Sequence, residues 1–163
     1  MRVYSVTMQN QTIVADATLV IVHSDSTLGS SGSTLTILRA WVGQHGTTTS
    51  QQLGIMLALK ASAFGTYSAT TPQMHHFLTG ASAITGATTG AESTAGTDAS
   101  AEGAGAVTPV IYDAFNNLNG WLWVPTPEER IIVPADTAII LKIVGTPAAL
   151  GNWSAGITYL ELN

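Results

Sequence analysis

Residues 34–42 read TLTILRAWV and contain the clearest alternating pattern in the chain. Side chains two positions apart lie on one face of a strand, so a strand here has two distinct faces. One face would carry Leu35, Ile37, Arg39 and Trp41, and the other Thr34, Thr36, Leu38, Ala40 and Val42. Short runs of β-branched and aromatic residues, broken by turn formers, are typical of antiparallel β proteins. The stretch therefore predicts a strand of an all-β domain.

Seven further segments have strand patterns: 3–8, 17–23, 53–60, 120–124, 129–133, 137–144 and 154–162. Segment 53–60 (LGIMLALK) also fits a short helix, but Gly54 and the Leu-x-Leu steps favour a strand. Eight strands are the number expected for a jelly roll or a similar two-sheet sandwich. We therefore predict an antiparallel, jelly-roll-like sandwich that forms a single domain over residues 1–163.

Segment 137–144 (TAIILKIV) is apolar on both faces, with Ile139, Leu141 and Ile143 on one side and Ile140 and Val144 on the other. One face of an isolated antiparallel sheet is expected to be solvated. Two explanations stay open: a loop covers the second face, or Ile140 and Val144 form a subunit contact.

Residues 80–105 form a low-complexity segment in which every residue except Ile84, Glu92, Asp98 and Glu102 is Ala, Gly, Ser or Thr. Such a composition buries too little apolar surface to fold unaided. We predict a long loop, either a surface loop of its own subunit or an ordered arm over a neighbouring one.

Charged residues make up only 9% of the chain, against roughly 25% in ordinary soluble domains. A surface so poor in charge is covered by a partner at small desolvation cost. The net charge is −5, and the five basic residues are scattered, which argues against nucleic-acid and membrane-surface partners. The opening MRVYSVTMQNQ lacks the apolar stretch of a signal peptide, so we expect synthesis in a cytoplasm and use without export.

The sequence offers little that could carry chemistry. It has no cysteine, and its four histidines include the adjacent pair His75-His76 without the spacing of a metal motif. Segment 29–33 (GSSGS) lacks the strand-turn-helix context of a serine nucleophile. We therefore predict no catalytic residues, no cofactor site and no metal site, and a protein that is not an enzyme.

The most informative segment is 113–130, DAFNNLNGWLWVPTPEER. Trp121 and Trp123 are two residues apart and so lie on the same face of a strand. At least one of them is expected in the core. The other, together with the proline-rich corner, is a candidate anchor on a neighbouring protein, since aromatic residues and arginine dominate interface hot spots. The corner contributes Pro125, Pro127, Glu128, Glu129 and Arg130, with Arg130 close enough to pair with one glutamate.

The residues DAFN (113–116), GWLW (120–123) and PTPEER (125–130) resemble a family of small structural proteins encoded near the capsid genes of tailed phages and prophages. The resemblance extends to Val6-Thr7, to VGQ (42–44) and to LEL (160–162), so it spans the chain. In that family acidic residues often follow VGQ, whereas HGTTTS (45–50) stands here. The resemblance implies a structural role in the virion.

The leading interpretation is a head decoration (cement) protein, a homotrimer seated where major capsid subunits meet, on the capsid surface of a virion assembled in the host cytoplasm. Binding only the expanded lattice would stabilise that state. A rival interpretation is a carbohydrate- or receptor-binding tip of a phage fibre, which requires exposed tryptophans. A third is a cupin-like metalloenzyme, which requires convergent histidines.

Overall fold

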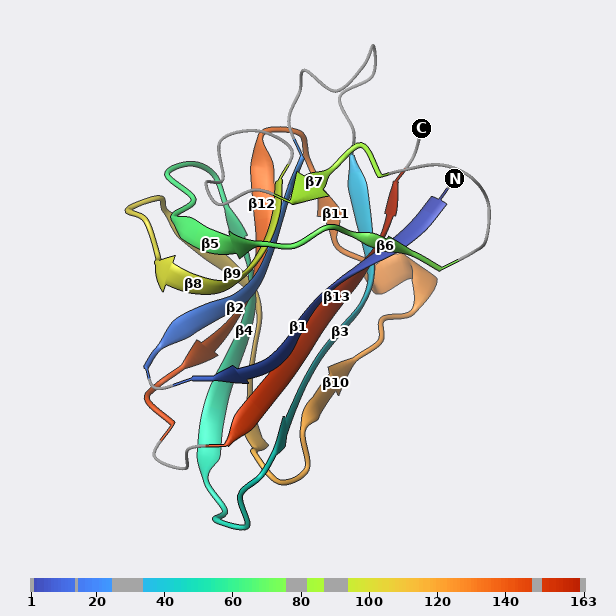
Figure 1. Cartoon of the computed structure of the whole chain (residues 1–163). Coiled ribbons are helices and arrows are strands. Elements are labelled where there is room, and N and C mark those ends of the chain that lie inside the picture. The colour runs from blue at the N-terminus through green and yellow to red at the C-terminus, as the bar shows by residue number, and fades with distance from the viewer. Residues whose placement is uncertain are drawn as a thin grey trace.

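The computed structural model describes residues 2–13, 15–24, 34–75, 82–86, 94–147 and 151–161 (Figure 1). They form two β-sheets packed face to face, which confirms the predicted all-β sandwich. One short 3-10 helix, η1 (Pro127–Glu129), interrupts the strands of this part of the chain. No helix in the described ranges is long and apolar enough to cross a membrane.

The first sheet has the order β10-β3-β13-β1-β6, and β11 also pairs with β3. Its strands are β1 (Arg2–Thr12), β3 (Leu35–His45), β6 (Gln73–Met74), β10 (Trp121–Trp123), β11 (Ile132–Val133) and β13 (Asn152–Glu161). The central pair, β1 and β13, runs antiparallel from Arg2 opposite Glu161 to Thr12 opposite Asn152. The two ends of the described chain therefore lie side by side (Figure 1).

The second sheet has the order β5-β8-β2-β12-β4-β9, and β7 pairs in parallel with β8. Its strands are β2 (Ala17–Ser24), β4 (Gln52–Lys60), β5 (Thr66–Ala69), β7 (Thr85–Gly86), β8 (Thr94–Ala101), β9 (Val107–Asn116) and β12 (Thr137–Val144). All eight predicted strands thus have a counterpart, including 53–60, where a strand was favoured over a helix. The predicted strand 129–133 is reduced to β11, because Glu129 belongs to η1.

The chain passes between the sheets in the manner of a jelly roll. β1 and β3 belong to the first sheet, while β2 and β4 belong to the second. β9 stays in the second sheet, β10 and β11 return to the first, β12 belongs to the second and β13 to the first. The resulting orders, β1-β13-β3-β10 and β2-β12-β4-β9, are those of two four-stranded jelly-roll sheets. The remaining strands, β5, β6, β7, β8 and β11, are additions to these two sheets.

One hydrophobic core fills the space between the two sheets. Its largest members are Trp153, Tyr4 and Tyr159, each no more than 1% exposed. The ring of Trp153 meets Phe115 edge to face, with the ring centroids 6.4 Å apart. Burial of each large apolar side chain contributes about 1.5–3 kcal/mol. The inner face of β12 supplies Ile139, Leu141 and Ile143, as the sequence predicts.

The predicted faces of β3 are wrong beyond Ile37, because the strand contains a bulge. On β13, Thr158 pairs with Arg39 and the next residue, Tyr159, pairs with Ile37, so Leu38 is the extra residue. A bulge reverses the alternation that follows it. Leu35 and Ile37 are therefore in the core together with Ala40 and Val42, while Arg39 and Trp41 lie on the outer face.

The low-complexity segment is not one long loop. Residues 94–101 form β8, which pairs with β2 on one side and with β5 on the other. Small residues are needed here because the backbone approaches its neighbours closely: a Cβ on Gly96 would lie 2.6 Å from Cβ of Tyr67. Residues 80–81 and 87–93 of the predicted loop lie outside the described residues.

Candidate protein interface

Segment 113–130 connects the edge of one sheet to the edge of the other. β9 is the last strand of the second sheet, and β10 pairs with β3 at the end of the first. A tight turn joins them, in which the backbone N–H of Asn119 donates to the carbonyl of Asn116. Gly120 follows with φ +69°, a conformation that glycine adopts without strain. The turn thus brings both edges to one flank of the sandwich.

Asn117 fixes this turn to the neighbouring loop. Its side chain is 1% exposed, accepts a hydrogen bond from the backbone of Gln51 (2.8 Å) and donates one to the carbonyl of Thr49 (2.9 Å). Its own backbone N–H donates to the carbonyl of Gln51 (3.1 Å). Buried amides with satisfied partners hold loops in a defined position.

Trp121 and Trp123 lie on one face of β10, as predicted, and both are half-buried against the core. The indole Nε1 of Trp121 donates to Oδ2 of Asp113 over 3.1 Å. Leu122, between them, points the other way and is 63% exposed. The exposed anchor of this strand is therefore the leucine rather than either tryptophan.

The predicted corner is present as the turn from β10 into η1. Pro125 is half-buried, whereas Pro127, Glu128, Glu129 and Arg130 are exposed. The carboxylate of Glu129 accepts hydrogen bonds from the backbone N–H and the hydroxyl of Thr126, which closes a capping box. The expected ion pair of Arg130 with a neighbouring glutamate is wrong: the ion pairs in the described ranges belong to Lys142.

All the large apolar side chains that are exposed in the described residues belong to residues 107–132. We call them the apolar flank: Val107, Val110, Tyr112, Leu118, Leu122, Val124 and Ile132. Tyr112, Leu122, Val124 and Ile132 are each at least 62% exposed. Tyr112 pairs with Met56 and lies on the outer face of the second sheet, whereas Leu122 and Ile132 lie on the outer face of the first. Scattered exposed apolar residues need no explanation, but a concentration along one flank is typical of a contact surface. Sequence reasoning identified the tryptophans and missed these residues, although the alternation W-L-W-V indicated an outward-facing pair.

The edge of β9 is closed to strand addition by its own residues. Pro109 lacks a backbone donor, and Val110 is the extra residue of a bulge opposite Leu57 and Ala58. In an antiparallel pair, every second residue of a strand forms backbone hydrogen bonds to the neighbouring strand. The backbone N–H of Asn117 bonds to Gln51. Counted back from Asn117 in steps of two, the bonded positions skip Tyr112 and Ala114, so the N–H groups of these two residues point away from β4. Asp113 covers one of them, since its Oδ1 accepts from the N–H of Ala114 (2.7 Å).

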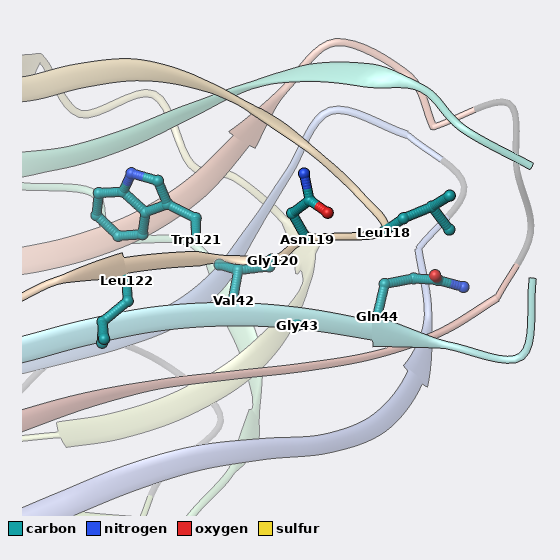
Figure 2. A pocket seen from close by; sticks show the side chains of 8 residues that line it. All are labelled: Val42, Gly43, Gln44, Leu118, Asn119, Gly120, Trp121 and Leu122. Carbon is teal, nitrogen blue, oxygen red and sulfur yellow. The ribbon is translucent and has the colours of Figure 1, made fainter. Parts of the chain in front are cut away.

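A shallow open pocket of about 420 Å³ lies where the turn meets β3 (Figure 2). Two backbone stretches face each other across it, and its lining consists of Val42, Gly43, Gln44, Leu118, Asn119, Gly120, Trp121 and Leu122. The side chains of Asn119 and Gln44 offer hydrogen-bonding groups next to the apolar ones (Figure 2). Two members of the apolar flank, Leu118 and Leu122, form part of its rim.

The second apolar face of β12 is covered by the chain itself. Ile140 is 0% exposed and belongs to a second cluster, with Ile21, Met56, Ala58 and Ala138, on the outer side of the second sheet. Tyr67, Phe64 and Ala99 pack over this cluster, and Val144 is half-buried at its margin. The cover thus comes from the same chain, but from strands β5 and β8 (Tyr67 and Ala99) as well as from the loop that carries Phe64, and Ile140 is not exposed for a subunit contact.

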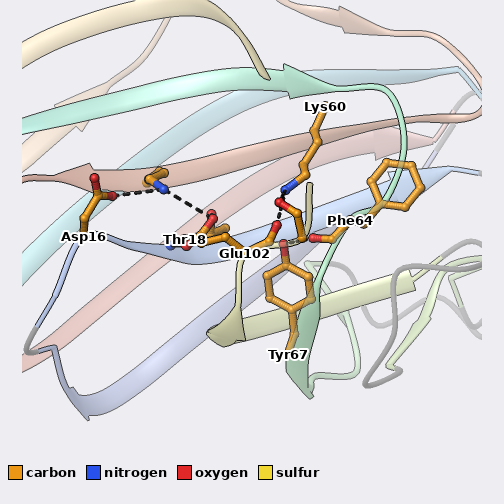
Figure 3. A network of polar contacts seen from close by, with 8 residues as sticks. Asp16, Thr18, Lys60, Phe64, Tyr67 and Glu102 are labelled. Carbon is orange, nitrogen blue, oxygen red and sulfur yellow. Dashed lines mark hydrogen bonds and ion pairs between the residues drawn. The ribbon is translucent and has the colours of Figure 1, made fainter. Parts of the chain in front are cut away.

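A network of polar groups fastens the covering segments, residues 61–69 and 94–105 (Figure 3). The carboxylate of Glu102 accepts from the backbone N–H (2.5 Å) and hydroxyl (2.7 Å) of Thr18. Lys142 lies 3.4 Å from the same carboxylate and 3.0 Å from Asp16. The Nζ of Lys60 donates to the carbonyls of Glu102 and Gly103.

Two groups of this region have shifted pKa values. Burial lowers the pKa of Lys60, Glu102 opposes that shift, and Lys142 adds to it. Burial, reinforced by Glu102, raises the pKa of Tyr67, whose hydroxyl donates to the carbonyl of Phe64. Both groups fasten the cover, and neither lines the pocket.

The histidines that the structure describes do not converge. His23 packs its ring on Phe64 with the centroids 4.1 Å apart, and His75 lies 2.6 Å from the hydroxyl of Ser5 on the other sheet. Within the described ranges, no group of three or more His, Asp or Glu residues could hold a metal ion. His76 lies outside them.

Comparison of the chain with protein-family models, with curated proteins and with solved structures finds no match. The resemblance to phage structural proteins therefore stays a prediction from the sequence.

Proposed function

We propose that this protein is a non-enzymatic virion component, a capsid decoration protein that binds the outer surface of the major capsid lattice and stabilises it. The apolar flank carries the proposal. It concentrates the exposed apolar side chains of the described residues on one edge of a sandwich whose chain is only 9% charged. A contact surface of this kind serves attachment to another protein.

The mechanism we propose is linkage without turnover. A protein that binds the expanded lattice and not its precursor stabilises the expanded state by RT ln(1 + [L]/Kd), which is about 2.7 kcal/mol per site when the free protein is at 100 times its Kd. A rigid sandwich suits this role, because little conformational entropy is lost when a preformed surface binds.

The test uses purified expanded capsids of the phage that carries the gene. At micromolar concentration the protein should co-sediment with the capsids and raise the temperature at which they open. Protein that remains entirely in the supernatant would overturn the proposal. The homotrimer is a separate part of the proposal, measured by the solution mass; a strict monomer would remove the trimer and leave lattice binding standing.

A carbohydrate- or receptor-binding fibre tip is the second candidate, and the pocket at Gln44, Asn119 and Trp121 favours it. The tryptophans themselves do not, because both pack against the core. A saccharide bound here would be held by the amide groups of Gln44 and Asn119. Titration with a panel of neutral and acidic monosaccharides, monitored at the Trp121 indole resonance, would support this candidate if Asn119→Ala removed the response. If no monosaccharide shifts the Trp121 indole resonance, this candidate is excluded.

A further inference from the structure

We propose that the apolar flank docks by side-chain packing onto an apolar surface of the partner that is rimmed by Lys or Arg, and not onto a second copy of this chain. This inference rests on the proposed function and names the chemistry of the surface that the protein attaches to.

The flank is suited to side-chain packing and not to strand addition. A partner strand would need a row of free N–H and C=O groups along β9. Pro109, the bulge at Val110 and the carboxylate of Asp113 interrupt that row. A partner must therefore be held by side-chain packing, and the residues it meets are Leu122 and Ile132, which share the outer face of the first sheet.

The charges of the flank favour a partner with a basic rim over a second copy of this chain. Residues 107–132 contain three carboxylates, those of Asp113, Glu128 and Glu129, against one guanidinium, that of Arg130. Asp113 and Glu129 accept hydrogen bonds from within the chain, whereas Glu128 is exposed and belongs to no ion pair in the part that the structure describes. A partner with basic groups at its rim complements these charges.

A second copy fits less well. In such a contact, both surfaces would carry more carboxylates than basic groups, and each chain already has a net charge of −5. Like charges brought together at an interface disfavour that pairing. The self-contact that would compensate is a reciprocal pair between Glu128 of one copy and Arg130 of the other, and charge reversal can detect it.

The experiment measures binding to expanded capsids for the Glu128→Lys and Arg130→Glu variants. With a basic rim on the partner, Glu128→Lys should weaken binding about tenfold, equivalent to about 1.4 kcal/mol, and Arg130→Glu should strengthen it. Opposite signs support the proposal. In a reciprocal self-contact, sedimentation should show both reversals weakening association and the double reversal restoring it, and that result would overturn the proposal.

The apolar part is tested with Leu122→Ser and Ile132→Ser, which should each weaken binding about tenfold. Both side chains are 63% exposed, so folding should be unchanged, and a thermal melt checks this. Gln73→Ser, an exposed position at β6 on the opposite edge of the first sheet, is the matched control. If neither Leu122→Ser nor Ile132→Ser changes capsid binding, the proposed docking surface is wrong, while the proposed decoration function still stands.

A second experiment needs no capsid. It therefore distinguishes failure of the proposed docking surface from failure of the proposed decoration function. A short peptide of alternating Leu and Lys and its Leu/Glu counterpart are titrated into the labelled protein, and backbone amide shifts are recorded. The proposal requires that the cationic peptide shift amides of residues 107–132, and that Leu122→Ser and Glu128→Lys reduce the response. Equal responses to both peptides, or shifts confined to other faces, would overturn it even if capsids are bound.

Discussion

Trp121 on β10 donates its indole N–H to the carboxylate of Asp113 on β9 over 3.1 Å, and this bond ties the edge of one sheet to the edge of the other. The second oxygen of the same carboxylate covers the outward N–H of Ala114. One side chain thus both closes the flank and protects a strand edge.

Replacing Asp113 should therefore affect stability and self-association together. Asp113→Ala should lower the free energy of unfolding by about 0.5–1.5 kcal/mol, because the exposed indole N–H and the edge N–H lose their protein acceptor and bond to water instead. Urea unfolding measures the first effect, and light scattering at high concentration measures the second. Asp113→Asn keeps one acceptor oxygen, so its free energy of unfolding should lie between those of the wild type and Asp113→Ala. If both variants lose the same stability, the effect comes from the charge alone.

Glu102 should hold the cover over the second sheet. Glu102→Ala removes the acceptor of two Thr18 bonds and one partner of Lys142, so unfolding should become easier by about 1–3 kcal/mol. Amide hydrogen exchange in residues 94–105 should accelerate more than in β13. Glu128→Gln removes an exposed carboxylate and should change stability by less than about 0.5 kcal/mol. Uniform acceleration across both sheets would contradict a local fastening.

Gly156 should be irreplaceable on the outer face of the first sheet. A Cβ there would lie 2.1 Å from Cζ2 of Trp41, so Gly156→Ala must displace the indole on which Arg39 stacks. We expect a loss of about 1–3 kcal/mol and a change in tryptophan fluorescence. Gly43→Ala is the matched control, because nothing lies within 4 Å of its Cβ. Equal effects at both glycines would show that the indole yields freely.

Lys60 should make stability depend on pH in the alkaline range. Its pKa is lowered in the folded protein, so between that value and 10.5 the unfolded chain binds more protons and stability rises with pH. The raised pKa values of Tyr67 and Tyr159 act in the opposite direction above pH 10, where the unfolded tyrosines ionise first. Denaturation at a series of pH values should show the rise below pH 10, and Lys60→Met should abolish it. A variant that retains the rise would exclude Lys60 as its source.

The sequence predicts the sandwich well because each long strand carries its own period-two pattern. Prediction from the sequence fails at positions whose conformation depends on a neighbouring strand. The bulge at Leu38 exists only in the pairing of β3 with β13, so alternation alone placed Arg39 in the wrong set. β8 consists of small residues because Tyr67 and Ile21 approach Gly96, and composition cannot reveal that approach.

The candidate interface was predicted in part for the same reason. Pro127, Glu128 and Arg130 are exposed in the folded chain, as a local reading of the corner implies. Ile140 was misplaced because its cover comes from residues distant in sequence, among them Tyr67 and Ala99. β9 was overlooked because Pro109 and a bulge break its alternation, which are the same features that close its edge.

The pairing of Arg2 with Glu161 has a practical consequence for attaching cargo. Both ends of the described chain leave the sandwich at one rim, whereas the turn at 117–120 belongs to the opposite rim, where Asn152 pairs with His45. A tag or a foreign domain joined to either terminus would therefore project from the same side, at a distance from the Leu118 end of the apolar flank. Fusions at either terminus should therefore leave that end of the flank free to bind.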